Sequence, residues 1–373
     1  MLAQDLTLIV KVTNACNFRC DYCFIEPAIF HKSMSIETGR LLLRSFLDSP
    51  ELRSVLFVWH GGEPLLRGKN FLQAMFAEQR ARPTAVRVRN AIQTNATRLD
   101  PAMLAFLLEN AVEIGLSLDG PQGINDAVRR PRSAYRSAYE TTLEAANSLA
   151  ERGRRPGAIV VVSRANVDIP VEVYATFRTA NIDIKLNPIT RAGLAAVDSS
   201  LGISAAEYGD FLIALFDAWW TDTEAPISID PFRQHLHRLI DEPVSHNCVF
   251  TLHCQRHFLG ISPDGDIFPC GMFQGEPAFR YGNLRSLAPG DISATPLFAD
   301  IETREQRVLK DCEPCAFHDL CYGGCMFHAL KDGRVLNRRD WYCEGYRRYF
   351  VHLAEKVRDD LKSGGARTQA RLS

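Results

Sequence analysis

The most informative segment of this 373-residue chain reads Cys16-Asn17-Phe18-Arg19-Cys20-Asp21-Tyr22-Cys23. Its three cysteines follow the pattern Cys-x3-Cys-x2-Cys. The segment comes shortly after residues 6–12, whose apolar and β-branched side chains predict a buried strand. The three cysteines therefore lie on the loop that leaves the first predicted strand.

The same alternation of strand and helix continues downstream and predicts an α/β protein. A helix is expected from about residue 35. Strands are then predicted at 55–59, 86–93, 112–118, 158–162 and 182–186, with helices at 71–78, 101–108, 139–149, 171–179 and 205–220. Six β/α units imply a parallel sheet and suit a partial or complete TIM-like barrel. We expect a partial (β/α)6 barrel over 1–224, a cysteine-rich domain with a C-terminal helix over 225–361, and a fraying tail over 362–373.

Composition excludes several classes of protein. Lys and Arg total 43 against 44 Asp and Glu, a net charge of -1, which argues against a nucleic-acid-binding protein. No apolar run reaches the roughly 18 residues of a membrane span, and the N-terminus has no signal-peptide pattern. We therefore expect a cytoplasmic protein. In that setting, eleven cysteines favour metal ligation over a disulfide framework.

The first cysteine group has the donor set of an iron–sulfur cluster with one open iron. Three thiolates can hold three irons of a [4Fe–4S] cluster and leave the fourth without a protein ligand. That iron can chelate the amino and carboxylate groups of S-adenosylmethionine (SAM), whose carbon–sulfur bond then splits to give a 5′-deoxyadenosyl radical. The alternative is a zinc site with a fourth ligand such as His31, but zinc pairs usually use Cys-x2-Cys, so the x3 spacing fits poorly.

On these residues the sequence resembles the radical SAM superfamily, whose signature is this triplet after the first barrel strand. Further segments end successive predicted strands, where barrel sites form. Taken alone, each could be a strand-ending turn or a helix cap. The resemblance implies a SAM pocket lined by Tyr22, Gly61, Gly62, Glu63, Pro64, Gln93, Asn95, Ser117, Asp119 and Ser163, and less specifically by Asn166 and Asn187.

The eight remaining cysteines all lie after position 247. Their spacing resembles the SPASM extension of radical SAM peptide-modifying enzymes. Eight thiolates supply two closed [4Fe–4S] clusters with four ligands each, although two structural zinc ions would also fit. The resemblance implies that one auxiliary cluster uses Cys248, Cys254, Cys270 and Cys325, and the other Cys312, Cys315, Cys321 and Cys343.

The whole layout resembles two related groups of enzymes. One is the anaerobic sulfatase-maturing enzymes, which oxidise Cys or Ser to formylglycine; the other is the maturases of ribosomally made peptides (RiPPs), including those that form cyclophanes. The first group carries an Asp general base directly after the cysteine matching Cys270, where this chain has Gly271. The sequence therefore favours a peptide crosslink of the carbon–carbon cyclophane type. His60 and Asp230 are the weak candidates for a catalytic base.

The implied partners are a precursor peptide and an external electron donor. Only five residues precede the first predicted strand, so we expect leader recognition to use the barrel, the cysteine-rich region or a separate protein. Two other hypotheses stay open at this point. One is a metal-stabilised binding module without SAM chemistry, and the other is radical chemistry on a small molecule.

Overall fold

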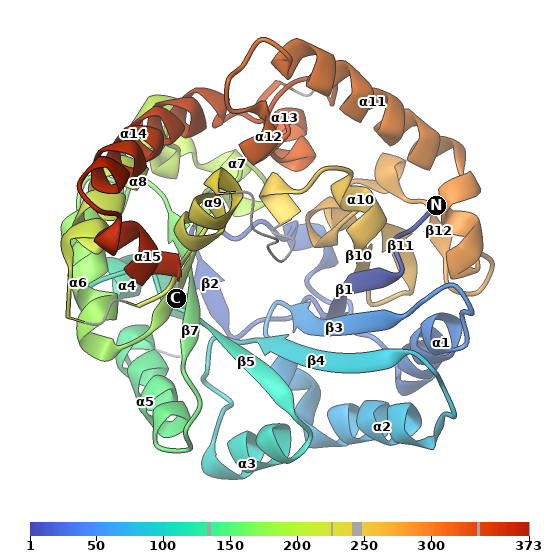
Figure 1. Cartoon of the computed structure of the whole chain (residues 1–373). Coiled ribbons are helices and arrows are strands. Elements are labelled where there is room, and N and C mark those ends of the chain that lie inside the picture. The colour runs from blue at the N-terminus through green and yellow to red at the C-terminus, as the bar shows by residue number, and fades with distance from the viewer. Residues whose placement is uncertain (133–135, 225–226, 241–247, 334–335, 373) are drawn as a thin grey trace.

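The computed structural model describes residues 1–132, 136–224, 227–240, 248–333 and 336–372. Within them the chain forms an α/β fold built on a mostly parallel sheet (Figure 1). The strands are β1 (Asp5–Thr13), β2 (Phe18–Cys20), β3 (Ser54–Gly61), β4 (Arg87–Gln93), β5 (Val112–Ser117), β6 (Arg129–Pro131), β7 (Gly157–Val162), β8 (Asp183–Pro188), β9 (Ile229–Asp230), β10 (Phe258–Ile261), β11 (Asp266–Phe268) and β12 (Gly282–Asn283).

Helices follow most of the long strands, as the sequence pattern predicts. They are α1 (Ile36–Leu47), α2 (Gly68–Ala81), α3 (Pro101–Glu109), α4 (Gln122–Val128), α5 (Ala138–Ala150), α6 (Pro170–Ala180), α7 (Leu194–Val197), α8 (Ala205–Thr221), α9 (Phe232–Leu239), α10 (Cys254–His257), α11 (Pro296–Cys312), α12 (His318–Cys321), α13 (Met326–Gly333), α14 (Cys343–Lys362) and α15 (Ala366–Leu372). Five of them begin at a side-chain cap, which satisfies a free backbone amide of the first turn; the caps are Ser35, Asp100, Ser137, Ser204 and Thr295.

The large sheet has the strand order β12-β11-β10-β1-β3-β4-β5-β7-β8-β9. All neighbours from β10 to β9 are parallel, whereas β11 and β12 are antiparallel. Because β12 and β9 are its edges, the sheet is open, so the complete barrel is wrong and the partial one agrees. The sequence pattern also missed β10, which pairs with β1 although residues 258–261 lie beyond the expected boundary near 225.

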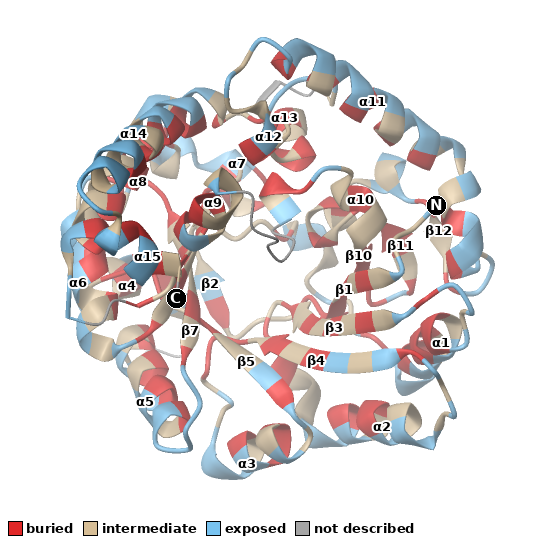
Figure 2. Cartoon of the chain, in the orientation of Figure 1, coloured by how far each residue is buried: buried red, intermediate tan, exposed pale blue. Residues whose placement is uncertain are grey.

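The core lies between the sheet and the helices around it. Figure 2 shows buried residues on the helix faces turned toward the strands and exposed residues on the outer faces. On β1, one side chain in two enters this core, namely Leu6, Leu8, Val10 and Val12. The intervening side chains of β1 therefore point to the concave side of the sheet.

The C-terminal stretch differs from the expected fraying tail. Residues 366–372 form α15, and Arg371 is buried. Its guanidinium lies 4.9 Å from the Trp219 ring centroid and donates to the Trp219 carbonyl at 2.7 Å. A polar sequence packs here because the planar guanidinium of arginine lies over an aromatic ring and also donates to helix-terminal carbonyls. Among the described helices, none is long and apolar enough to cross a bilayer.

Candidate functional site

The first cysteine loop leaves β1 and returns through the short strand β2. The Phe18 amide donates to the Cys16 sulfur at 3.3 Å, and the Cys23 amide donates to the Cys20 carbonyl at 3.1 Å. These bonds hold three partly buried thiols in one loop, and all eleven cysteines of the chain are free of disulfides. The loop is therefore built from local backbone contacts that leave every sulfur available as a ligand.

The electrostatics of these thiols fit a cluster. Burial raises the pKa of Cys16 to about 11 and that of Cys20 to about 12, and the charges of neighbouring thiolates add to both pKa increases. Thiols with pKa values raised in this way become thiolates only when a positive charge, such as a metal ion, lies beside them. Across the described part of the chain, no three His, Cys, Asp or Glu side chains stand close enough to ligate one metal ion. In a [4Fe–4S] cluster each thiolate binds a different iron, so the donor set can hold that group.

The segment after β3 lies against the start of this loop. The amides of Gly62 and Glu63 donate to the carbonyls of Thr13 and Ala15 at 2.8 and 2.9 Å. A methyl group added at Gly61 would stand 1.9 Å from the Thr13 oxygen, and one added at Gly62 would stand 2.3 Å from the Ala15 oxygen. Only glycine allows this approach, so the two glycines fix the distance between the β3 end and the cysteine loop.

Glu63 is fully buried and connects three strand ends. Its carboxylate accepts bonds from the Leu65 amide at 2.9 Å, the Thr94 hydroxyl at 2.8 Å and the Asn95 amide at 2.8 Å. Burial nevertheless raises the pKa of Glu63 to about 7. Asn95 in turn donates its side-chain amide to Asn17 at 2.9 Å and lies 3.9 Å from the Cys16 sulfur. The predicted pocket residues at the ends of β3 and β4 therefore meet at the cysteine loop.

The carboxylate of Asp119 accepts hydrogen bonds from several donors of the protein. It pairs with the buried Arg129 through bonds of 2.8 and 3.0 Å, accepts the Val161 amide at 2.9 Å, and accepts the Tyr22 hydroxyl. Ser163 likewise lies in a closed turn, where its amide donates to the Asn166 side chain at 2.9 Å. These predicted pocket residues thus organise the strand ends around Tyr22.

The other predicted residues have less defined roles. Gln93 donates to the Ser117 hydroxyl at 3.0 Å, which links the ends of β4 and β5. Pro64 begins the short 3-10 turn after Glu63, and Asn187 lies within β8, next to the end of that strand. Gln93, Ser117 and Pro64 lie at strand ends, whereas Asn187 lies inside its strand, although the sequence placed it just after that strand.

The two candidate bases lie far apart in the sheet. His60 is on β3, whereas Asp230 is on β9, with β4, β5, β7 and β8 between them. His60 Nδ1 accepts the Gly61 amide at 2.7 Å, and burial together with the charge of Lys11 lowers the pKa of His60 to about 3. His60 is therefore neutral near pH 7, and the structure does not bring it together with Asp230.

Sequence reasoning missed Lys11. This β1 residue is only 1% exposed, and its ammonium lies 4.3 Å from the Phe24 ring centroid. Burial lowers the pKa of Lys11 to about 8, while the thiolates of Cys23 and Cys270 oppose that decrease. The signal was a lone lysine inside the apolar run of residues 6–12. Lys11 therefore places a cation between the two cysteine groups.

The eight later cysteines divide into two sets by the charge interactions among their thiolates. In the first set, Cys248, Cys254, Cys270 and Cys325, the thiolate charges raise one another's pKa values. The second set behaves in the same way and comprises Cys312, Cys315, Cys321 and Cys343. Burial is the largest cause of the pKa increase in seven of these thiols, namely Cys248, Cys254, Cys270, Cys312, Cys321, Cys325 and Cys343. Each set offers four thiols, the number that one closed [4Fe–4S] cluster requires.

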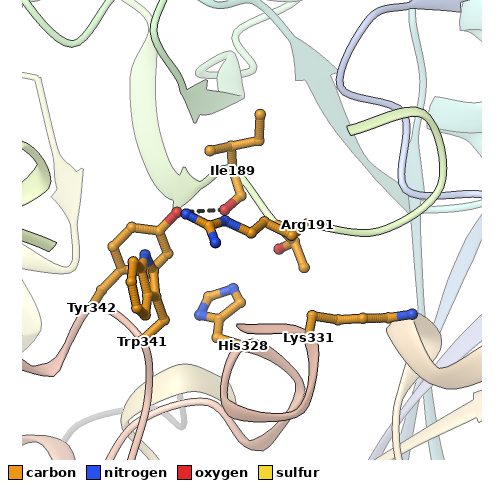
Figure 3. A pocket seen from close by; sticks show the side chains of 7 residues that line it. Ile189, Arg191, His328, Lys331, Trp341 and Tyr342 are labelled. Carbon is orange, nitrogen blue, oxygen red and sulfur yellow. Dashed lines mark hydrogen bonds between the residues drawn. The ribbon is translucent and has the colours of Figure 1, made fainter. Parts of the chain in front are cut away.

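A small hollow lies where the end of β8 meets the C-terminal cysteine region (Figure 3). The Arg191 guanidinium lies 4.8 Å from the Trp341 ring centroid, and the Tyr342 hydroxyl donates to the Ile189 carbonyl at 2.6 Å. His328 closes the hollow from α13. Its volume of about 10 Å³ has room for roughly one water molecule. These contacts join the two regions and do not form a substrate pocket.

Comparisons with known proteins agree with this geometry. Residues 10–174 match the radical SAM superfamily. The serine-type anaerobic sulfatase-maturating enzyme of Bacteroides thetaiotaomicron is 27% identical over 94% of this chain and 90% of its own length. The cysteine-type anaerobic sulfatase-maturating enzyme of Clostridium perfringens is 24% identical over 94% of this chain and 97% of its own.

Solved structures share the fold. Native anSMEcpe with bound AdoMet and Kp18Cys peptide covers 96% of this chain and 99% of its own, with a TM-score of 0.84 and 23% identity. Streptococcus suis SuiB bound to precursor peptide SuiA covers 91% and 76%, with a TM-score of 0.65 and 19% identity. The family match and the strand-end geometry together identify residues 10–174 as a radical SAM domain, and this chain as an enzyme that contains it.

Proposed function

We propose that this enzyme is a peptide maturase that forms a crosslink within a ribosomally made precursor, of the carbon–carbon cyclophane type. Cys16, Cys20 and Cys23 would hold the [4Fe–4S] cluster. When bound, the cluster and SAM together supply a 5′-deoxyadenosyl radical that takes a hydrogen atom from an unactivated carbon. The observation that carries the radical chemistry is the buried cysteine loop held against Gly61 and Gly62.

The chain's own residues would bind and orient SAM at the strand ends. Gly61 and Gly62 let the end of β3 approach the cysteine loop closely, and Glu63 ties that backbone to the end of β4 by accepting hydrogen bonds from Thr94 and Asn95. Asp119 holds Tyr22 beside Cys23 and therefore positions the pocket. The proposed cofactor-binding set is the one expected from the sequence, with Pro64, Gln93, Asn95, Ser117 and Ser163 as further members.

The C-terminal region is proposed to be a SPASM domain over 225–361, following a barrel domain over 1–224. Its two sets of four thiols would each hold an auxiliary [4Fe–4S] cluster. The mutual effects of the thiolates within each set support this division, because they act between thiols far apart in sequence, such as Cys254 and Cys325. Such closed clusters would serve to return the second electron of the oxidation.

The surroundings of Gly271 favour a crosslink over formylglycine. A methyl group at Gly271 would stand 2.6 Å from Ile9 Cγ2 and 3.6 Å from Lys11 Cε. A carboxylate side chain therefore has no room at the position where the resembling sulfatase-maturing enzymes carry their base. The side chain of Ile9 occupies that space instead, with the stem of Lys11 in contact beyond it, and the partly buried imidazole of His60 stays neutral. A mechanism that first deprotonates a thiol or hydroxyl lacks its acceptor here.

Formylglycine formation is the second candidate, because the curated relatives over most of the chain are sulfatase-maturating enzymes. SuiB, which was solved with its precursor peptide, supports a peptide substrate in either case. The two products differ in a measurable way. A crosslink removes two hydrogens and leaves no carbonyl, whereas formylglycine carries an aldehyde that hydrazides trap.

The test is mass spectrometry of short peptides encoded beside the gene, co-expressed with the enzyme under low oxygen, with Cys16→Ala as control. Loss of two hydrogens with a gap in the fragment series and no trappable aldehyde is the expected result. An aldehyde at Cys or Ser would overturn the crosslink. Metal analysis of the anaerobically purified protein accompanies the test, since zinc in place of iron would remove the radical chemistry itself.

A further inference from the structure

The first cysteine loop is covered on one side by a small antiparallel ribbon that the sequence did not reveal. It pairs β2 with β6, and the register sets Arg19 directly opposite Arg130. Both arginines are exposed, whereas Phe18 of the same ribbon is buried. Like charges opposite each other in a ladder destabilise the pair. The arrangement therefore destabilises the ribbon locally, and the fold alone does not explain why two arginines stand opposite each other.

The ribbon carries more positive than negative charge. Arg132 extends the ribbon and is also exposed, while Asp21 is the acid that pairs with Arg130. Within the described residues, no acidic side chain pairs with Arg19 or Arg132. Three cations against one anion leave an excess of about two charges on a chain whose net charge is -1. The excess is therefore a local feature and does not reflect the composition as a whole.

This charged surface adjoins the first cysteine group directly. Arg19 precedes Cys20 in the ribbon, and the Arg132 guanidinium donates to the Cys16 carbonyl at 3.1 Å. An electron entering at the ribbon thus has to cross only one residue of backbone before it reaches a cysteine ligand.

We propose that Arg19, Arg130 and Arg132, the ribbon arginines, dock an acidic electron-donor protein of the low-potential flavodoxin or ferredoxin class. The docked donor gives up one electron and is oxidised, and the first cluster is reduced by that electron. This inference rests on the proposed radical SAM function, since only a cluster at the first cysteine group needs that electron. Complementary charge would orient the donor and raise its rate of encounter.

The test compares Arg19→Gln/Arg130→Gln with the wild-type holoenzyme and with Arg87→Gln. Arg87 is an exposed arginine at the opposite end of a barrel strand, where β4 begins, so it is a matched control. Stopped-flow spectroscopy follows cluster reduction by a flavodoxin hydroquinone at about 20 mM and at about 500 mM salt. Low salt leaves the charge attraction long-ranged, and high salt screens it to a few ångström.

At low salt the double variant is expected to be reduced at least tenfold more slowly, with the difference closing at high salt. Arg87→Gln should match wild type, and Arg19→Lys/Arg130→Lys should keep most of the rate. SAM cleavage at saturating dithionite should stay unchanged in all variants, because dithionite needs no docking surface. Absence of cleavage even in wild type would instead refute the proposed function.

Two results would overturn the docking proposal. One is a flavodoxin rate in the double variant equal to wild type at low salt. The other is a loss of dithionite-driven cleavage or of iron in the double variant that the lysine variant does not rescue, which would mean a structural role. Weaker binding of the substrate peptide with an unchanged flavodoxin rate would assign the surface to the peptide and likewise refute the donor.

Discussion

Replacing Asp119 by asparagine is expected to destabilise the protein by about 3–5 kcal/mol, the usual cost of leaving one member of a buried ion pair unpaired. The side chains of Asp119 and Arg129 are 1% and 8% exposed, so water cannot take over the role of the carboxylate. Asparagine has nearly the same shape but one acceptor oxygen in place of two. The NH2 group of asparagine would face a hydrogen-bond donor in either orientation of the side chain. In one orientation it faces the Arg129 Nε–H and the Tyr22 hydroxyl, and in the other it faces the Val161 amide.

The assay is anaerobic thermal unfolding followed by circular dichroism, at matched iron content and a fixed heating rate. At about 2 °C per kcal/mol for a chain of this size, the midpoint should fall by roughly 6–10 °C. The matched control is Glu113→Gln. It breaks a pair with Arg89 at 2.6 Å whose side chains are 57% and 64% exposed, and it should leave the midpoint unchanged.

A second variant separates charge from packing. Adding Arg129→Met to Asp119→Asn removes the orphaned cation and should recover a substantial part of the midpoint. If Asp119→Asn shifts the midpoint no more than Glu113→Gln does, the buried pair is not a structural element and this reasoning fails. If the double variant is no better than the single one, the loss comes from the hydrogen bonds of Tyr22 and Val161.

Three further predictions concern the pocket. Gly62→Ala, whose methyl would stand 2.3 Å from a backbone oxygen of the cysteine loop, should weaken SAM binding by tenfold or more in equilibrium dialysis. Gly123→Ala, which has open space around it, should bind normally. Burial raises the folded pKa of Glu63 to about 7 from 4.5, so the stability that Glu63 contributes is present below about pH 4.5 and is lost as pH rises through 7. Glu63→Gln should therefore reduce the dependence of the denaturation midpoint on pH across this window. An unchanged slope of midpoint against pH would refute the assignment. Gly271→Asp should lower the unfolding midpoint by the equivalent of about 1–3 kcal/mol through overpacking and produce no aldehyde in peptides, whereas an aldehyde product would contradict the steric argument.

Much of the fold follows from local pattern. The six long strands and their helices are predicted correctly because each is long enough to show its period of apolar residues, and β1 with residues 6–12 is typical. The ribbon of β2 and β6 has three residues in each strand, too few for any period to appear. β10 was missed for the same reason, since its four residues gain their place from β1, some 250 positions earlier in the chain.

The same distinction, between what neighbours along the chain specify and what distant residues specify, holds for the candidate site. The sequence by itself determined the chemistry, because the spacing of Cys16, Cys20 and Cys23 and the glycines after β3 depend only on neighbours along the chain. Tertiary structure alone decided how that chemistry is surrounded. It surrounds the Asp119 carboxylate with four hydrogen-bond donors of the protein and places the stem of Lys11 beside Gly271. Burial and charge pairing depend on groups distant in sequence, and no local pattern contains them.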